Sequence, residues 1–206
     1  MLWCLIASVA VVACLGCRGP SDYRPVSGDI IFQTSTSGQS RAIQLATGSA
    51  YSHLGLVHLR GGDAFVFEAV EPVRSTPLAE WIARGEGGAF VVKRLKNSSQ
   101  VLTPEALARM LAVGEGFVGK PYDLYFEWSD DRIYCSELVW KIYQRALGLE
   151  IGAPATLGSF DLSPPPVRAK LAERWGAHPP LAEPVISPAA MFASDELVEV
   201  YRRGAR

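Results

Sequence analysis

A single cysteine at the start of a predicted helix is the residue best suited to covalent chemistry. Cys135 lies three and four residues before Leu138 and Val139, which together with Ile142 define the inward face of that helix, so Cys135 shares this face. In the first helical turn, unpaired backbone N–H groups and the helix dipole stabilise an anion. They favour a thiolate and can bind an oxyanion on an attacked carbonyl. The spacing predicts a cysteine nucleophile; the alternative is a buried structural cysteine.

A thiolate nucleophile needs a base, and the chain has three histidines. His178 is the least suitable, because it lies in a proline-rich segment. His53 and His58 lie five residues apart in one predicted strand, so their side chains face opposite sides of the sheet. Only one of these two histidines can therefore point at Cys135.

Two apolar runs joined by Gly61-Gly62 predict a β-hairpin. The first run covers residues 52–60 and the second covers residues 63–70. A two-residue turn would pair Arg60 with Asp63. A turn one residue longer would move every side chain of the second strand to the other face.

The two-residue turn makes Glu68 a candidate partner for His53. Gly55 then falls opposite Glu68, so Glu68 and His53 are diagonal neighbours on one face, within reach of each other. Gly55 is expected to leave open space across from Glu68. A carboxylate beside an imidazole fixes its tautomer and stabilises its charged form, as in a catalytic triad. The alternative is a solvated Glu68 and a His53 that is a satisfied polar residue near a sheet edge.

Strands and short helices are predicted to position these side chains. Strands are expected at residues 28–33, 52–60, 63–70, 89–95 and 195–201, and helices at 41–45, 77–84, 103–118 and 135–147. Thr103 as N-cap and Pro104 at the first helical position mark one helix start. After residue 148 the many prolines predict loops with a turn or two of helix. The loops at 34–40 and 126–132 are candidate walls of the site.

The composition is that of one globular domain. The chain has 206 residues, of which 49% are hydrophobic, which is enough for a core of its own. The formal net charge is −1 and the basic residues are scattered, so we expect no nucleic-acid partner.

The N-terminal segment is typical of an export signal. Residues 2–15 are almost wholly apolar, but the run is short for a membrane-spanning helix. It ends in Cys14-Leu15-Gly16-Cys17, which resembles a bacterial lipoprotein signal in which Cys17 would be lipidated. No Lys or Arg precedes the run, and Cys14 stands where an aliphatic residue is usual. Plain secretion or a short anchor is therefore the alternative.

These observations divide the chain into a signal (1–17), a linker (18–27) and a single domain (28–206). Cys4, Cys14 and Cys17 all lie in the signal, so Cys135 has no disulfide partner within its domain. We expect an exported protein of the cell envelope, facing the periplasm or the outside. A lipid on Cys17 would tether it to the membrane.

Five segments, in order along the chain, resemble one known family: Gly28–Phe32, Ser52–Val57, Phe67–Ala69, Gly119–Asp123 and Tyr134–Val139. Together they resemble the circularly permuted NlpC/P60 superfamily of papain-like cysteine hydrolases, and within it the YiiX/YebB-like group. Papain-like enzymes usually place the cysteine before the histidine. Here the order is reversed, as a permuted chain requires.

The resemblance implies a fold and a set of roles. The fold is α+β, with an antiparallel sheet closed as a small barrel and packed against helices, and with the nucleophile at a helix N-terminus. Cys135 would be the nucleophile, His53 the base and Glu68 the third member. Tyr122 would assist the oxyanion site, or else simply pack the loop under the helix. Residues 184–188 resemble the family's closing loop.

The function predicted is a cysteine amidase or peptidase that cleaves an amide through a thioester, acting on a small peptide or a peptidoglycan-derived substrate. One alternative is a lipid acyltransferase or thioesterase with the same triad, whose acyl groove Trp81, Phe126 and Trp128 could line if they are not core. The other is a non-catalytic binding module of the envelope. We expect no cofactor and no metal, because a lone cysteine with separated histidines lacks the clustering of a metal site.

Overall fold

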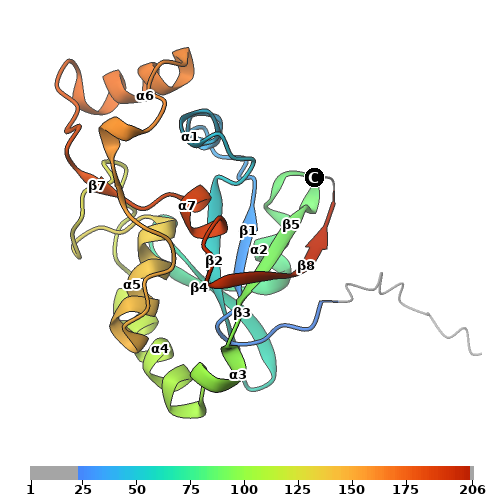
Figure 1. The fold of residues 1–206 in the computed structure, drawn as a ribbon. Helices are drawn as coiled ribbons and strands as arrows, with labels where there is room; N and C mark the ends of the chain where they lie inside the picture. Colours follow the sequence, from blue (N-terminus) through green and yellow to red (C-terminus); the bar gives the residue numbers. More distant parts are fainter. Residues whose placement is uncertain (1–22, 205–206) are drawn as a thin grey trace, which may run out of the picture.

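A six-stranded antiparallel sheet forms the centre of the fold in this computed structural model, which describes residues 23–204 (Figure 1). The strand order is β4-β3-β2-β1-β5-β8. The strands are β1 (Ile30–Gln33), β2 (His53–Arg60), β3 (Asp63–Glu68), β4 (Arg74–Pro77), β5 (Phe90–Leu95) and β8 (Leu197–Arg203). A separate pair joins β6 (Ala155–Thr156) to β7 (Pro184–Val185).

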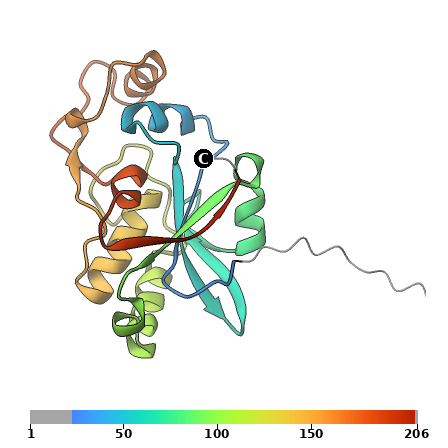
Figure 2. The same ribbon diagram turned by 45° about the vertical axis from the view of Figure 1, so that its right-hand side comes forward.

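Helices cover both faces of the sheet. The helices in the described part of the chain are α1 (Ser40–Thr47), α2 (Leu78–Ala83), α3 (Ser98–Val101), α4 (Pro104–Phe117), α5 (Cys135–Leu147), α6 (Pro165–Trp175) and α7 (Pro188–Phe192). Figure 2 shows α4 and α5 on one side of the sheet and α2 on the other. The helix α6 lies beside α1, away from the sheet (Figure 1).

The strand β1 shows why both faces are apolar. Ile30 and Phe32 point into the larger core beneath α4 and α5, whereas Ile31 points into a second core around Trp81 of α2. Successive side chains of a strand face opposite sides, so a strand covered on both faces reads as a continuous apolar run. This alternation explains the apolar run that predicted the strand.

The predicted hairpin is confirmed. Arg60 pairs with Asp63 across Gly61-Gly62, and both glycines have positive φ values, of 60° and 93°. A two-residue turn of this kind requires positive φ, which glycine adopts without strain. The predicted strands near residues 28–33, 89–95 and 195–201 and the four predicted helices are also present. In α4, the Thr103 hydroxyl accepts a hydrogen bond from the Ala106 N–H at 3.3 Å, as its N-cap position predicts.

The structure corrects several expectations. Within residues 23–204 the edge strands β4 and β8 are not paired with one another, so the predicted closure into a barrel is not found. The sequence analysis did not predict β4 and α3. It also predicted only a turn or two of helix where α6 runs for 11 residues, because it gave the prolines too much weight. Prolines are tolerated in the first turn of a helix, and those of α6 lie there.

The folded body begins earlier than predicted. Tyr23 falls in the range assigned to the linker, yet it is buried in the second core, and its hydroxyl donates to Asp29 at 2.7 Å. The predicted signal and the Cys17 anchor lie outside the described residues. Among the helices that the structure describes, none has the length and apolar character needed to span a bilayer.

Candidate active site

Cys135 is the first residue of α5, where Tyr134 is the N-cap. The helix packs against β2, the strand that begins with His53. Cys135 is buried, and it forms part of the wall of an apolar cleft. The sheet and the helix therefore bring the predicted nucleophile and base together from positions 82 residues apart.

His53 lies between Cys135 and Glu68 and is hydrogen-bonded to both. Its Nε2 atom is 3.1 Å from Glu68 Oε2. Because Nε2 faces the carboxylate, Nδ1 is the ring nitrogen left for the thiol. This order of thiol, imidazole and carboxylate is the one that a triad requires, and the contact between His53 and Glu68 confirms the diagonal pairing that the hairpin register predicted.

The carboxylate of Glu68 is fully buried and firmly held. Its Oε1 atom accepts a hydrogen bond from the Thr76 hydroxyl at 2.5 Å and forms an ion pair with Arg84. Arg74 lies further off, with Nε 3.6 Å from the same oxygen. Glu68 is therefore a supported anion, and the alternative of a solvated strand residue is wrong.

The environment holds Glu68 and His53 in their charged forms. Burial alone would raise the pKa of Glu68, but His53, Thr76 and Arg84 outweigh it and lower the pKa to about 2. Burial alone would lower the pKa of His53, but hydrogen bonds and charge interactions with Cys135 and Glu68 raise it to about 9. An imidazolium is thus stable well above neutral pH.

The thiol of Cys135 is activated. Burial raises its pKa, but the hydrogen bond and positive charge of His53 outweigh burial, so the net shift is downward. The backbone N–H groups of Leu54 and Ser136 also lower this pKa by donating to the sulfur. These surroundings favour a Cys135 thiolate facing a His53 imidazolium, with donors from both β2 and the first turn of α5.

Gly55 does not leave open space as predicted. A Cβ atom at position 55 would lie 2.7 Å from the Phe67 carbonyl oxygen and would overlap the Val66 side chain. Gly55 is therefore needed for close packing between β2 and β3. Trp81 fills the region behind the site, where its ring stacks on His53 at 5.8 Å between centroids.

Tyr122 lines the polar cleft together with His53. Burial raises the pKa of the Tyr122 phenol, and the charge of Cys135 raises it further. Its hydroxyl accepts a hydrogen bond from Gln39 Nε2 at 2.7 Å. Its backbone N–H donates to Glu71 Oε2 at 2.9 Å. Tyr122 is therefore part of the wall of the cleft into which His53 opens, and its role at the oxyanion site stays a prediction.

Two clefts of different character meet at the site. The first is apolar and lies between α1 and α6, with Cys135 at its inner wall; its lining includes Ala42, Ile43, Ala46, Phe126, Leu157, Phe160, Leu162, Val167, Leu171, Trp175 and Ile186. The second is polar and is lined by His53, Tyr122, residues 35–39 and charged side chains such as Glu71, Arg84, Glu86 and Glu173. Gln39, Lys170 and Arg174 line both clefts.

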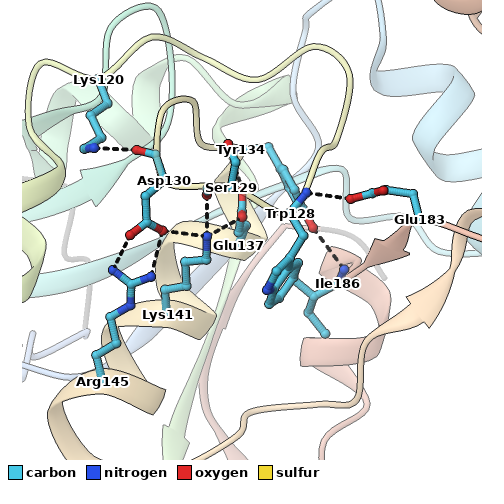
Figure 3. Close-up of polar contacts among 10 residues, drawn as sticks. All are labelled: Lys120, Trp128, Ser129, Asp130, Tyr134, Glu137, Lys141, Arg145, Glu183 and Ile186. Carbon is cyan, nitrogen blue, oxygen red and sulfur yellow. Dashed lines mark hydrogen bonds and ion pairs between the residues drawn. The ribbon is translucent and has the colours of Figure 1, made fainter. Parts of the chain in front are cut away.

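A network of charges anchors the start of α5 and the preceding loop (Figure 3). Lys141 Nζ lies 2.6 Å from Glu137 Oε1 and forms an ion pair with Asp130 at 2.9 Å, and it also donates to the Ser129 carbonyl. Arg145 pairs with Asp130 through two hydrogen bonds of 2.7 and 2.8 Å. This network fixes the loop on the helix and so fixes the N-terminal turn that carries Cys135.

The segment 184–188 closes the same end of α5. Ile186 donates its N–H to the Tyr134 hydroxyl at 3.1 Å, and its carbonyl accepts from Ser136 Oγ at 2.7 Å (Figure 3 shows the first bond). Val185, Ile186, Ser187 and Pro188 line the apolar cleft. The segment therefore lies where a closing loop would be.

The structure brings together all four predicted site residues: Cys135, His53, Glu68 and Tyr122. His58 lies on the opposite face of its strand and contacts Ser75 Oγ at 2.8 Å, and His178 is exposed. Of the three predicted acyl-groove aromatics, Phe126 lines the cleft, whereas Trp81 stacks on His53 and Trp128 packs edge-on against Trp140.

The sequence analysis missed the partners that support these residues. Thr76 and Arg84 bind Glu68 from β4 and from the end of α2, and Gln39 and Arg174 lie beside Tyr122. No local pattern marks them, because each is an ordinary polar residue. These residues reach the site only because segments that are distant in the sequence pack together.

An α+β fold in which a helix-terminal cysteine faces a histidine on an antiparallel strand, with the histidine earlier in the chain, defines a permuted papain-like cysteine hydrolase. A family profile described as the permuted papain-like amidase enzyme, YaeF/YiiX, C92 family matches residues 24–201. The chain therefore belongs to this family of cysteine peptidases and amidases.

Two similar proteins come from Escherichia coli. The chain is 51% identical over 178 residues to the uncharacterised protein YiiX of strain K12, covering 86% of this chain and 87% of YiiX. It is 50% identical to a crystal structure described as the metalloprotein YiiX of strain O157:H7. That match has a TM-score of 0.84 and covers 88% of this chain and 99% of the other. Both similarities support the same family.

Proposed function

We propose that this protein cleaves an amide through a thioester on Cys135, with His53 as the acid and base and Glu68 as the residue that orients His53. The observation that carries this proposal is the hydrogen-bonded line Cys135–His53–Glu68, in which the carboxylate is fully buried and the imidazole pKa is raised to about 9. This line combines a nucleophile, a proton carrier and an orienting group.

In the first step the Cys135 thiolate forms a bond to the amide carbon, and the carbonyl π electrons move onto the oxygen. The N–H groups at the start of α5, including that of Cys135, and the Tyr122 hydroxyl would stabilise this oxyanion. The oxyanion then collapses, the C–N bond breaks, and the nitrogen takes the proton of the His53 imidazolium. The products are an amine and a thioester.

In the second step neutral His53 removes a proton from water, and the resulting hydroxide attacks the thioester carbon. The second oxyanion collapses with cleavage of the C–S bond. This releases the carboxylic acid and restores the thiolate and the imidazolium. Glu68 keeps the same ring orientation in both steps because Thr76 and Arg84 hold its carboxylate.

A cell-wall peptide is the substrate that the predicted export signal favours. A hydrolase facing the periplasm or the outside meets peptidoglycan, and the polar cleft beside His53 carries charges of both signs, which suits the charged groups of a peptide. The substrate, the location and the lipid tether are proposals that rest on the signal and on family analogy.

The apolar cleft favours a second candidate, an acyl-ester or thioester hydrolase or acyltransferase. Apolar side chains of α1 and α6 line the approach to Cys135, and such a lining suits an aliphatic chain better than a charged peptide. The substitution Ala46→Phe would partly fill the cleft. We expect it to slow cleavage of a long-chain ester more than that of a peptide amide, with exposed Ala172→Phe on α6 as the matched control.

A metal centre fits these residues poorly. The similar E. coli structure is described as a metalloprotein. Within residues 23–204, no cluster of three or more His, Cys, Asp or Glu side chains is arranged to hold a metal ion. Glu68 is also occupied, because its two oxygens already contact Thr76, Arg84 and His53.

The first test is the rate of alkylation of Cys135 by iodoacetamide as a function of pH, with mass spectrometry of the Cys135 peptide to separate it from the other cysteines. We expect rapid alkylation well below pH 8 in the wild type and a return to the pH profile of an ordinary thiol in His53→Ala. An ordinary profile in the wild type would contradict the proposal. A panel of peptide amides and acyl esters would then separate the two substrate classes.

A further inference from the structure

We infer that Arg174 and Gln39 form a hydrogen-bond relay that points the Tyr122 hydroxyl proton at the reaction centre. This inference deepens the proposed function and rests on it. Gln39 is the N-cap residue of α1 and Arg174 lies in the last turn of α6, so the relay joins a loop of the polar cleft to a helix that roofs the apolar cleft. Both residues line both clefts.

Arg174 sets the orientation of the Gln39 amide. Its NH2 group lies 2.6 Å from Gln39 Oε1. A guanidinium can only donate hydrogen bonds, so the amide oxygen of Gln39 must face it and the amide NH₂ must face away. Arg174 is itself held in place, because its guanidinium carbon lies 5.1 Å from the centre of the Phe126 ring.

The oriented Gln39 then sets the orientation of the Tyr122 hydroxyl. Gln39 Nε2 lies 2.7 Å from the Tyr122 oxygen, and an amide NH₂ can only donate, so the phenol oxygen accepts. The phenol proton must therefore point elsewhere. In the part of the chain that the structure describes, no hydrogen bond from the Tyr122 hydroxyl to another acceptor occurs. Tyr122 shares the wall of the polar cleft with His53, and Gln39 shares the wall of the apolar cleft with Cys135, so the reaction centre lies between the two clefts that the relay joins.

The relay therefore leaves Tyr122 with one free donor in the cleft that His53 lines. When Cys135 Sγ bonds to a carbonyl carbon and the π electrons move to the oxygen, this O–H can donate to the new oxyanion. Removing one such donor in other enzymes typically slows the reaction by about 10²–10³-fold. Gln39 and Arg174 are positioning residues, since they act only through Tyr122.

The decisive variant is Gln39→Glu, which is nearly isosteric. A carboxylate beside Arg174 is ionised and can only accept hydrogen bonds. It keeps the contact with Arg174, so a purely structural role would survive. It would instead accept the Tyr122 proton and take this donor away from the oxyanion.

Two probes used on the full-length protein separate this effect from thiolate formation. Acylation of Cys135 by p-nitrophenyl acetate passes through an oxyanion, whereas alkylation by iodoacetamide does not. We expect Gln39→Glu to lower the ratio of acylation to alkylation rates by about 10²-fold, as Tyr122→Phe should. Gln44→Glu, the same change in α1 at a residue outside both clefts, should leave the ratio unchanged.

A double-mutant cycle isolates the relay from the direct effect of the added charge. In the Tyr122→Phe background, Gln39→Glu should change the ratio by less than about threefold, because no phenol proton is left to redirect. Arg174→Lys keeps a donor for the Gln39 amide oxygen, so it should retain most of the wild-type ratio of acylation to alkylation rates. Arg174→Met has no such donor and should lower this ratio. Equal effects of Gln39→Glu with and without Tyr122, or no effect at all, would overturn the relay. Absence of rapid alkylation in the wild type would instead overturn the proposed function.

Discussion

Glu68 and Glu137 are both fully buried and lie close to the reacting pair, yet their surroundings favour opposite protonation states. The pKa of Glu68 is lowered to about 2, whereas burial raises the pKa of Glu137 to about 8. Glu68 ends a strand and contacts His53. Glu137 lies in the first turn of α5, where the helix dipole should favour its ionised form.

The number of hydrogen-bond donors and positive charges around each carboxylate explains the difference in pKa. Glu68 has Thr76, Arg84 and the imidazolium of His53 around it. Glu137 has one ammonium, that of Lys141, which also serves Asp130. The carboxylate of Asp123 also raises the pKa of Glu137. A helix N-terminus and one shared ion pair therefore do not compensate for complete burial, whereas several converging donors do.

The largest effect should come from His53→Ala, which removes the residue that lies between Glu68 and the reacting Cys135. We expect acylation of Cys135 to slow by about 10⁴-fold, the upper range for loss of a general acid and base. Glu68 keeps Arg84 and Thr76, so the fold should survive. Rates of p-nitrophenolate release, with circular dichroism as a folding control, test this, and a loss below tenfold would remove His53 from the mechanism.

The next largest effect should come from Glu68→Gln, which removes the negative charge beside His53. The imidazolium loses its partner, so the pKa of His53 should fall from about 9 toward its ordinary value of 6.5. Activity should drop by about 10²-fold or more, and the loss of activity on the alkaline side should begin at lower pH. The measurement is a pH–rate profile, with Glu137→Gln as the matched control. This control should not change the pH at which activity falls on the alkaline side.

The comparison also predicts opposite dependences of stability on pH. Between about pH 4.5 and 8 the folded protein holds a proton on Glu137 that the unfolded chain has lost, so stability falls as the pH rises through this window. Glu137→Gln should remove this fall, on the order of 4 kcal/mol in the free energy of unfolding. The contribution of Glu68 has the other sign: it is present above about pH 4.5 and is lost as the pH falls toward 2.

Urea unfolding of the wild type, Glu68→Gln and Glu137→Gln at several pH values measures both effects. The difference between wild type and Glu137→Gln should grow from pH 5 to pH 8, whereas that between wild type and Glu68→Gln should shrink below pH 4. Parallel curves for the wild type and Glu137→Gln would show that the proton on Glu137 does not distinguish the folded from the unfolded state.

The smallest effect should come from Arg74→Ala. The Arg74 side chain is half exposed, and its Nε lies 3.6 Å from Glu68, so solvent screens the interaction. We expect less than about 1 kcal/mol of lost stability and less than about a threefold change in acylation rate. A loss as large as that of Glu68→Gln would mean that Arg74, and not Arg84 with Thr76, keeps Glu68 ionised.

Local patterns in the sequence were sufficient to predict the main helices and strands and the line of Cys135, His53 and Glu68. The helical spacing after Cys135 placed it in the first turn of α5, and Gly61-Gly62 fixed the register that sets Glu68 diagonal to His53. Both inferences depend on residues close in sequence, where backbone geometry permits few alternatives. Tyr122 was predicted from family resemblance alone, and the structure places it in the cleft that His53 also lines.

Long-range packing decided the rest. Gln39 and Tyr122 are 83 residues apart, and Gln39 and Arg174 are 135 residues apart. The sequence around each of them is ordinary, so nothing local predicts that they meet. The sequence also left open whether Trp81 lines a cleft or lies in the core, because an apolar ring suits both places. The packing of α2 on the sheet places it in the second core, where it stacks on His53. The sequence by itself determined which residues could react and which strand and helix carry them. Only the tertiary structure decided which polar groups surround them, because such contacts form when distant segments pack together.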